Sequence, residues 1–179
     1  MNRTEIANYA LALIGNARIT SLDESSVLAN RLKDMLPFSE RAVLREFDWP
    51  SMIGRASLNR LVTTPDNAPY AYAYAPLDWS RLINVVKGSV YLYEGDYIYS
   101  DDVTLTVKYI KPPQEEYHDI GLSEAISLHL AMRAAIDIAK DESLQAMLAR
   151  EYEKIQGKAI GLAIRESDGE TQPPAGWFQ

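Results

Sequence analysis

Cysteine is absent from all 179 residues of the chain. Its absence excludes disulfide bonds, thiolate metal sites and a cysteine nucleophile. Nothing in the composition therefore links the fold to an oxidising compartment, and an intracellular origin is expected. With 47% hydrophobic residues, the chain is long enough to bury one substantial core. A single domain, residues 1–179, is the expectation.

Long apolar runs are also missing. No stretch approaches the roughly 20 residues that a membrane-spanning helix needs. The first residues, MNRTEIANYALALIG, are amphipathic and contain an acid, unlike a secretory signal peptide. We therefore expect a protein that is not secreted by that route and is not bound in a membrane.

Positive charge is scarce. Lysine and arginine number 18 against 25 acids, which gives a formal net charge of -7. Binding to DNA relies on basic residues that displace counterions from phosphates, so this balance argues against general affinity for nucleic acid. The acids are densest from Tyr91 to Asp119, where only Lys108 and Lys111 oppose them. They are Glu94, Asp96, Asp101, Asp102, Glu115, Glu116 and Asp119.

The sequence lacks the motifs G-x-S-x-G, H-E-x-x-H, G-x-G-x-x-G and the Walker loop. The run EEYHD, residues 115–119, combines carboxylates with a histidine, but acids that precede a helix explain it better than a metal site. His129 fits a hydrogen-bonded core or interface residue better than a catalytic base. Asp101 and Asp102 fit a turn better than a catalytic carboxylate pair. We therefore predict no enzymatic activity, no cofactor and no metal.

Apolar residues recur at helical spacing in four segments. The predicted helices span about residues 3–15, 22–47, 122–140 and 141–166. Gly15 is expected to end the first helix in a left-handed conformation. A capping box of Ser21 and Glu24 is expected to start the second helix, and Pro37 to bend or split it.

The third predicted helix is apolar on nearly every face, so it needs cover on several sides. Ser123 is expected to cap it, and Asp141 to cap the last helix. The join at Lys140 and Asp141 is so short that the last two helices should form an antiparallel hairpin.

A β insert is predicted at about residues 52–117, where period-two alternation and prolines replace the helical spacing. SVYLYEGDYIYS predicts a hairpin that turns at Glu94-Gly95-Asp96, with Asp101 and Asp102 in the next turn. VTLTVKYI predicts a following strand with Val103, Leu105, Val107 and Tyr109 on one face. The fold class is thus mainly α with an inserted small antiparallel β region (α+β): a helical bundle core, a β hairpin or meander, and an extended C-terminal arm at about residues 167–179.

Nine of the eleven tyrosines lie between Tyr70 and Tyr117. A two- or three-stranded insert has one inner face, so tyrosines on its other face must meet water or another molecule. Protein contacts are enriched in tyrosine, whereas the nearby acids disfavour base stacking. Trp79 is expected to pack under the insert. The tyrosines predicted at a partner interface are Tyr70, Tyr72, Tyr74, Tyr91, Tyr93, Tyr97 and Tyr99.

A family resemblance is carried by five segments in this order: ALALIGNARITSLDE, LPFSERAVLREFDWPSMIGRASL, PYAYAYAPLDWSRLINV, VTLTVKYI and EAISLHLAMRAAIDIA. The chain resembles the tail tubular protein A family, the head-tail adaptors of short-tailed bacteriophages and their relatives. The resemblance covers nearly the whole chain. It rests most on Trp49, on YAYAPLD at residues 72–78, on Arg81 and on the strand LTVKYI.

The resemblance implies a ring of twelve copies between the portal protein and the tail nozzle of a virion. Genomic double-stranded DNA passes through the ring, and the family has no enzymatic activity and no cofactor. Tail fibres are a further candidate partner, and synthesis takes place in the host bacterial cytoplasm. Acids of the 91–119 segment or of the last helix would then face the channel and repel DNA phosphates, so that DNA slides. The predicted channel-lining acids are Glu94, Asp96, Asp101 and Asp102.

In this setting the tyrosine-bearing insert is the expected docking surface for the next ring, and Trp177 and Phe178 are expected to reach the portal. An adaptor in the neck of a long-tailed phage would share this chemistry. The alternative is a monomeric α+β protein, or an enzyme, whose tyrosine-rich cleft binds a small molecule or carbohydrate. Asp101, Asp102 or Glu115 would supply its polar contacts.

Overall fold

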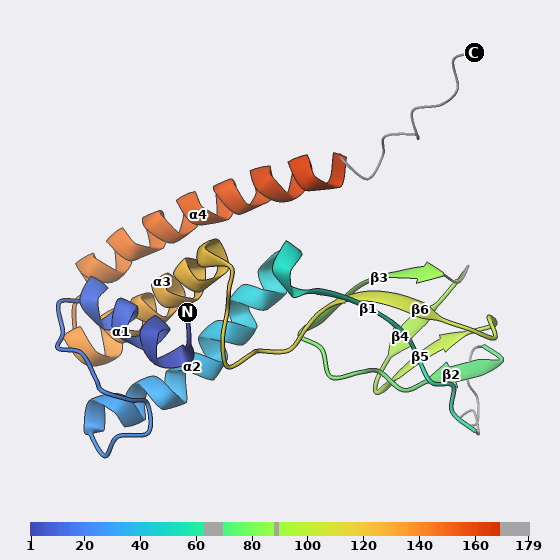
Figure 1. Cartoon of the computed structure of the whole chain (residues 1–179), viewed down its shortest axis with the longest axis horizontal. Helices are drawn as coiled ribbons and strands as arrows, with labels where there is room; N and C mark the ends of the chain where they lie inside the picture. Colours follow the sequence, from blue (N-terminus) through green and yellow to red (C-terminus); the bar gives the residue numbers. More distant parts are fainter. Residues whose placement is uncertain (63–69, 88–89, 169–179) are drawn as a thin grey trace, which may run out of the picture. The chain divides into compact units, whose positions relative to one another are not determined.

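The computed structural model describes residues 1–62, 70–87 and 90–168, which form two compact units (Figure 1). The helical unit comprises Met1–Ser51 and Gln114–Gln179, and the β unit comprises Met52–Pro113. The described residues combine four α-helices with two three-stranded antiparallel sheets, which confirms the predicted α+β fold class. None of the described helices is both long enough and apolar enough to cross a membrane.

Helix α1 (Arg3–Leu13) begins with a capping box. The Asn2 side chain accepts a hydrogen bond from the Glu5 amide at 2.9 Å, and the Glu5 carboxylate accepts one from the Asn2 amide at 2.8 Å. The helix ends as predicted, because Gly15 has a left-handed φ of 72°.

Helix α2 (Val27–Glu46) starts later than predicted. Its N-cap is Ser26, whose hydroxyl accepts a hydrogen bond from the Ala29 amide at 3.1 Å. The prediction that Ser21 and Glu24 start the helix is wrong, because Glu24 fixes a preceding turn instead. Its carboxylate accepts hydrogen bonds from the Thr20 amide at 2.7 Å and from the Ser26 hydroxyl at 2.8 Å.

Helix α2 also continues through Pro37 as one element, so the chain is not split there. Proline at this position removes the hydrogen bond to the Lys33 carbonyl, but Lys33 is exposed and water can replace that bond. After α2, the Trp49 indole donates to the Val43 carbonyl at 2.9 Å. A 3-10 helix, η1 (Pro50–Met52), then leads into the β unit.

Helix α3 (Ile120–Ala134) is the central element of the helical unit and packs against α1, α2 and α4 (Figure 1). This position accounts for its apolar composition. Its N-cap is Asp119, whose carboxylate accepts a hydrogen bond from the Leu122 amide at 3.0 Å. Ser123, the predicted cap, is buried one turn into the helix and donates to the Asp119 carbonyl at 2.8 Å, so that prediction is wrong.

From α3 the chain passes into a short π-helix, η2 (Ala135–Ala139), and then into α4 (Glu142–Asp168). Lys140 turns the chain with a left-handed φ of 56°. Asp141 caps α4 as predicted, since its carboxylate accepts a hydrogen bond from the Leu144 amide at 3.0 Å. Helices α3 and α4 pack against each other, in keeping with the short connection.

The β unit contains two antiparallel sheets. The first has the order β1-β6-β3, and the second has the order β2-β5-β4. The strands are β1 (Ile53–Ser57), β2 (Tyr72–Tyr74), β3 (Arg81–Lys87), β4 (Leu92–Glu94), β5 (Tyr97–Ser100) and β6 (Thr106–Ile110). The predicted hairpin is confirmed as β4-β5, with Gly95 in the turn at a φ of 59°.

The core of the β unit lies between the two sheets. Tyr74 and Ile98 come from the sheet β2-β5-β4. Val107 belongs to β6 of the other sheet, and Leu105 directly precedes that strand. The insert was expected to have a single inner face, but β6 pairs with β1 and β3 rather than with the hairpin, which creates a second one. Val103, expected on the inner face, lies before β6 and is 65% exposed.

Candidate interaction surface

The seven tyrosines predicted at a partner interface differ in exposure. Tyr74 is 0% exposed and Tyr99 is 9% exposed, so both are corrected from interface to buried residues. Tyr74 lies in the core between the sheets, and the Tyr99 ring packs edge-on against Tyr97 at 6.1 Å. Half-buried positions are Tyr70, Tyr72 and Tyr97, and exposed positions are Tyr91 and Tyr93.

In the described part of the β unit, Val90–Tyr93 form a run of four consecutive exposed apolar residues, here named the β4 strip. Val90 is 56%, Tyr91 39%, Leu92 37% and Tyr93 46% exposed. Its strand, β4, is an outer strand of the sheet β2-β5-β4. The Ser100 hydroxyl donates to the Val90 carbonyl at 2.7 Å, which fixes the start of the strip against β5. The strip is therefore preformed in the isolated chain.

Aromatic rings support the β4 strip from the core side. Trp79 packs against the core of the β unit, as expected, and its ring lies 6.2 Å from Tyr93 and 5.8 Å from Tyr109. The Tyr109 ring in turn lies over Gly54, where an added Cβ would come within 2.7 Å of its Cζ atom. Gly54 is thus the position that admits this stack.

The predicted channel acids occupy two environments. Glu94 and Asp96 are exposed beside the hairpin turn. The Asp101 carboxylate accepts a hydrogen bond from the Ala71 amide at 2.8 Å. Asp102 is half-buried, and its carboxylate accepts a hydrogen bond from the Ser100 hydroxyl at 3.2 Å. Asp101 and Asp102 therefore stabilise the turn after β5, whereas Glu94 and Asp96 face solvent.

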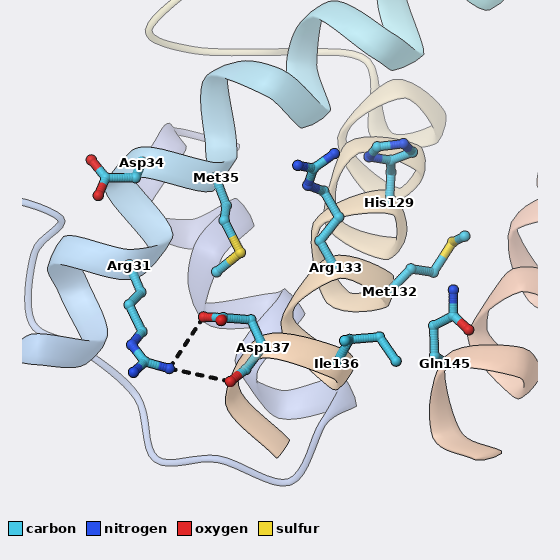
Figure 2. Close-up of a pocket in the computed structure, with 9 residues that line it drawn as sticks. All are labelled: Arg31, Asp34, Met35, His129, Met132, Arg133, Ile136, Asp137 and Gln145. Carbon is cyan, nitrogen blue, oxygen red and sulfur yellow. Dashed lines mark hydrogen bonds and ion pairs between the residues drawn. The ribbon is translucent and has the colours of Figure 1, made fainter. Parts of the chain in front are cut away.

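The helical unit contains a cavity of about 590 Å³ between α2, α3, η2 and α4. Figure 2 shows Arg31 of α2 reaching the Asp137 carboxylate and carbonyl of η2, each at 3.2 Å. Met132 and Ile136 project towards Gln145 of α4. The lining residues are Arg31, Asp34, Met35, His129, Met132, Arg133, Ile136, Asp137 and Gln145. Paired charges and thioethers suit binding, but they do not form a nucleophile-base pair.

His129 lines this cavity and is half-buried. Its ring packs edge-on against Tyr152 at 5.7 Å. Burial lowers the pKa of the imidazole below its ordinary value, which keeps the ring neutral at pH 7. Nδ1 has no hydrogen-bond partner among the described residues. The expectation of a hydrogen-bonded core histidine is therefore not met at this atom, and no described group orients His129 as a base.

Sequence reasoning missed a buried polar network around Glu40, whose side chain is 0% exposed. Arg3 donates to both Glu40 carboxylate oxygens, at 3.0 and 2.9 Å, and the Tyr117 hydroxyl donates to one at 3.2 Å. Burial raises the pKa of Glu40, against the opposing effect of Arg3. Burial also raises the pKa of Tyr117. The helical spacing of Glu40 from buried Leu36 and Leu44 was the available signal.

The points where the chain leaves and re-enters the helical unit are held together. The Ser51 hydroxyl donates to the Asp119 carboxylate at 2.9 Å. The Tyr117 hydroxyl, which contacts Glu40, accepts a hydrogen bond from the Gln114 amide at 3.0 Å. Within the run EEYHD, Tyr117 therefore has a structural role, because its hydroxyl links Gln114 to Glu40.

The described residues contain no group of three or more histidine, aspartate or glutamate side chains that could hold a metal ion. Trp177 and Phe178 lie outside the described residues. Among the residues that carry the family resemblance, Trp49 is 4% exposed and Arg81 half-buried. No protein-family model matches the chain, and no curated protein matches it either.

Proposed function

We propose that the chain is a structural head-tail adaptor of a tailed bacteriophage, similar to the tail tubular protein A family. Copies of the chain form a ring, with twelve expected, that joins the portal protein to the tail nozzle or the next neck protein. The helical unit builds the ring, and the β unit contacts the next component. The protein acts by assembly and not by catalysis.

The β4 strip carries this proposal. Four consecutive apolar residues are exposed at a sheet edge and are held in place by Ser100 and Trp79. A soluble monomer rarely exposes a contiguous apolar patch unless it binds something there. Tyr91 and Tyr93 add rings whose hydroxyls tolerate water before assembly and hydrogen-bond after it. These properties suit a surface that is wet in the free subunit and covered in the virion.

The charge of the chain agrees with a role around DNA. Each copy brings a net charge of -7, so a ring concentrates negative charge around its channel. Glu94, Asp96 and Asp101 are the exposed members of the predicted acid set. Asp101 and Asp102 accept hydrogen bonds that stabilise the turn after β5, so Glu94 and Asp96 are the main candidates for lining the channel.

Assembly is the direct test. The purified protein, alone and mixed with a portal ring, is measured by light scattering and negative-stain microscopy. We expect a ring, or a monomer that forms a ring on the portal. A compact monomer that leaves portal rings bare would contradict the proposal. Deleting residues 171–179, which removes Trp177 and Phe178, should weaken mounting on the portal; full affinity of the truncated chain would remove that contact.

The channel acids are tested in virions. Changing Glu94→Lys and Asp96→Lys together should slow DNA ejection, because cations in the channel bind phosphates. A matched double change at exposed acids of the helical unit, Asp23→Lys and Asp34→Lys, makes the same change in net charge. Equal ejection rates for the two variants would mean that Glu94 and Asp96 do not face DNA.

The helical cavity is the observation that favours the second candidate, a monomer that binds a small molecule. The cavity lies among helices and not at the tyrosines, so the candidate differs from a tyrosine-rich cleft. Thermal unfolding with a small-molecule panel separates the two functions. A compact monomer whose melting temperature rises with one ligand supports the second candidate. Ring formation without such a rise supports the adaptor.

A further inference from the structure

The outer strands of the two sheets differ in how their edges are protected. An open edge presents unpaired N–H and C=O groups, which proteins block with covering segments, bulges or basic residues. The edge of β2 is covered by residues 59–61. The Leu61 amide donates to the Ala73 carbonyl at 2.9 Å, and Arg60 forms a β-bridge with Tyr74.

The outer strands of the first sheet are protected in other ways. The pairing of β3 with β6 shifts register twice, which marks bulges or irregularities that interrupt a regular edge. Strand β1 carries Gly54 and the exposed Arg55. A glycine and a positive charge both make a strand a poor site for further pairing.

Strand β4 has none of these protections within the described residues. It pairs with β5 without a register shift, and its other side has no strand neighbour in the described sheet. The sequence from Val90 to Asp102 contains no lysine, arginine or proline. The β4 strip therefore joins an open backbone edge to an exposed apolar surface.

From this contrast we propose that β4 receives an extended segment of a partner protein, which pairs beside β4 and adds a fourth strand to the sheet β2-β5-β4. Main-chain hydrogen bonds set the register of the added strand, and side chains of the strip supply the apolar contact. This inference rests on the proposed function, in which the β unit contacts the next component of the tail or neck.

The chemistry of the edge defines the partner segment. Leu92 and Glu94 lie on one face of β4, and Tyr93 lies on the other. Exposed Glu94 and Asp96 have no basic residue near them in the 90–102 sequence. Since opposite charges favour cross-strand pairing, the complementary segment carries lysine or arginine beside Glu94 and Asp96 and apolar residues beside the strip.

A second copy of this chain is the less suitable occupant. Pairing of two β4 strands would bring two Glu94 side chains to one short ladder, with the Asp96 side chains of the two hairpin turns nearby and no basic residue of the 90–102 sequence to oppose them. Self-pairing is therefore an outcome that the test must detect.

The test uses the full-length protein and three synthetic eight-residue peptides. The first alternates lysine and valine, the second has the same side chains with every backbone amide N-methylated, and the third replaces lysine with glutamate. We expect the first peptide to bind and to slow amide hydrogen exchange at Tyr93, whose amide points away from β5 in the register of the β4-β5 hairpin. The N-methylated peptide should bind about tenfold more weakly, because it cannot donate backbone hydrogen bonds. The glutamate peptide should not bind.

Two protein variants sharpen the measurement. Leu92→Lys places a cation on the strip and should abolish binding of the lysine-valine peptide. Thr104→Lys, at an exposed position of the same unit, makes the same charge change and should leave binding unaltered. Equal binding of the first two peptides, or no exchange protection in β4, overturns the inference. So does a fall in the oligomeric mass of the peptide-free protein caused by Leu92→Lys alone, since self-pairing would then occupy the edge.

Ring formation on a portal is measured separately on the same wild-type sample. Rings without protection of β4 would overturn the added strand and leave the adaptor proposal standing. Protection of β4 in a chain that never forms rings would contradict the adaptor proposal alone.

Discussion

The two units treat polar and apolar side chains in opposite ways. In the helical unit, the buried Glu40 carboxylate is hydrogen-bonded to Arg3 and Tyr117. In the β unit, the four apolar residues Val90–Tyr93 are exposed to solvent. Burial of the Glu40 carboxylate is tolerated because Arg3 and Tyr117 satisfy its oxygens. Exposing Val90–Tyr93 is tolerable only while something else can cover them. The polar network around Glu40 is thus satisfied within one chain, whereas the β4 strip leaves four apolar residues exposed.

The same contrast holds for the central elements. Helix α3 is covered by three other helices, so most of its apolar side chains are buried within the chain. Among the described strands, β4 pairs on one side only, with β5. Changes at buried positions of the helical unit should therefore act on folding, and changes on the β4 strip should act on binding.

The largest expected effect lies in the helical unit. Glu40→Ala leaves the Arg3 guanidinium and the Tyr117 hydroxyl without their buried acceptor, and it should lower the free energy of unfolding by about 3–5 kcal/mol. Urea unfolding followed by far-UV circular dichroism measures this. Lys33→Ala, which removes only an exposed ion pair with Asp23, is the control and should leave the midpoint unchanged. Equal midpoints for both variants would contradict the importance of the network.

The next effect is confined to the β unit. Gly54→Ala places a Cβ within 2.7 Å of the Tyr109 ring, and displacing that ring should cost about 1–3 kcal/mol. Trp79, 5.8 Å from Tyr109, should report the change as a shift in tryptophan fluorescence. The helical circular dichroism signal should keep its midpoint. Loss of both signals together would show that the two units unfold as one.

A glycine in the helical unit supplies the matched control. Nothing lies within 4 Å of a Cβ added at Gly157 in α4. Gly157→Ala should therefore raise the free energy of unfolding by roughly 0.5–1 kcal/mol, because alanine favours the helix. Destabilisation by this change would mean that unseen packing at α4 limits the helix.

The pH dependence of stability should also separate the units. Because burial raises the pKa of Glu40 above its ordinary 4.5, the folded state holds this proton more tightly than the unfolded chain. The resulting stabilisation is complete below pH 4.5 and is lost as pH rises through the folded-state pKa. Wild-type stability relative to Glu40→Gln should therefore fall across that window. Parallel stability curves for the two proteins would show that the pKa of Glu40 is unshifted.

The smallest effect on stability is expected on the β4 strip. Leu92→Ser and Tyr93→Ser change exposed residues and should alter the free energy of unfolding by less than about 0.5 kcal/mol. They should nevertheless reduce attachment to the next tail or neck component, measured by co-sedimentation. Strong destabilisation without loss of attachment would reverse the assignment of the strip from contact surface to core.

Features set by neighbouring residues were predictable from the sequence. Gly15, Gly95 and Asp141 each act through a turn or cap within a few residues, and all three predictions are confirmed. The prediction that Ser123 caps α3 was wrong, because the nearby Asp119 is the N-cap. Local patterns name the candidates for a cap, but they rank them poorly.

Features set by distant residues were not predictable. Glu40 and Arg3 are 37 positions apart, so neither segment alone shows that the carboxylate is buried and paired. The separation of β5 and β6 into different sheets depends on β1 and β3, and it decides that Tyr74 is core. The cavity needs side chains from α2, α3, η2 and α4 together. The exposed run of the β4 strip, in contrast, was visible as an aromatic-rich segment.

The hydrogen bonds between Ser51 and Asp119 and between Gln114 and Tyr117 hold together the two ends of the insert, which bears on how such a chain evolves. The chain leaves and re-enters the helical unit at neighbouring points, so Met52–Pro113 form a continuous insert. Recombination at the two ends of this insert can replace it with another insert while the helical unit keeps its fold. Under the proposed adaptor function, exchange of this one block of codons would give a lineage a new attachment without a change in the helices.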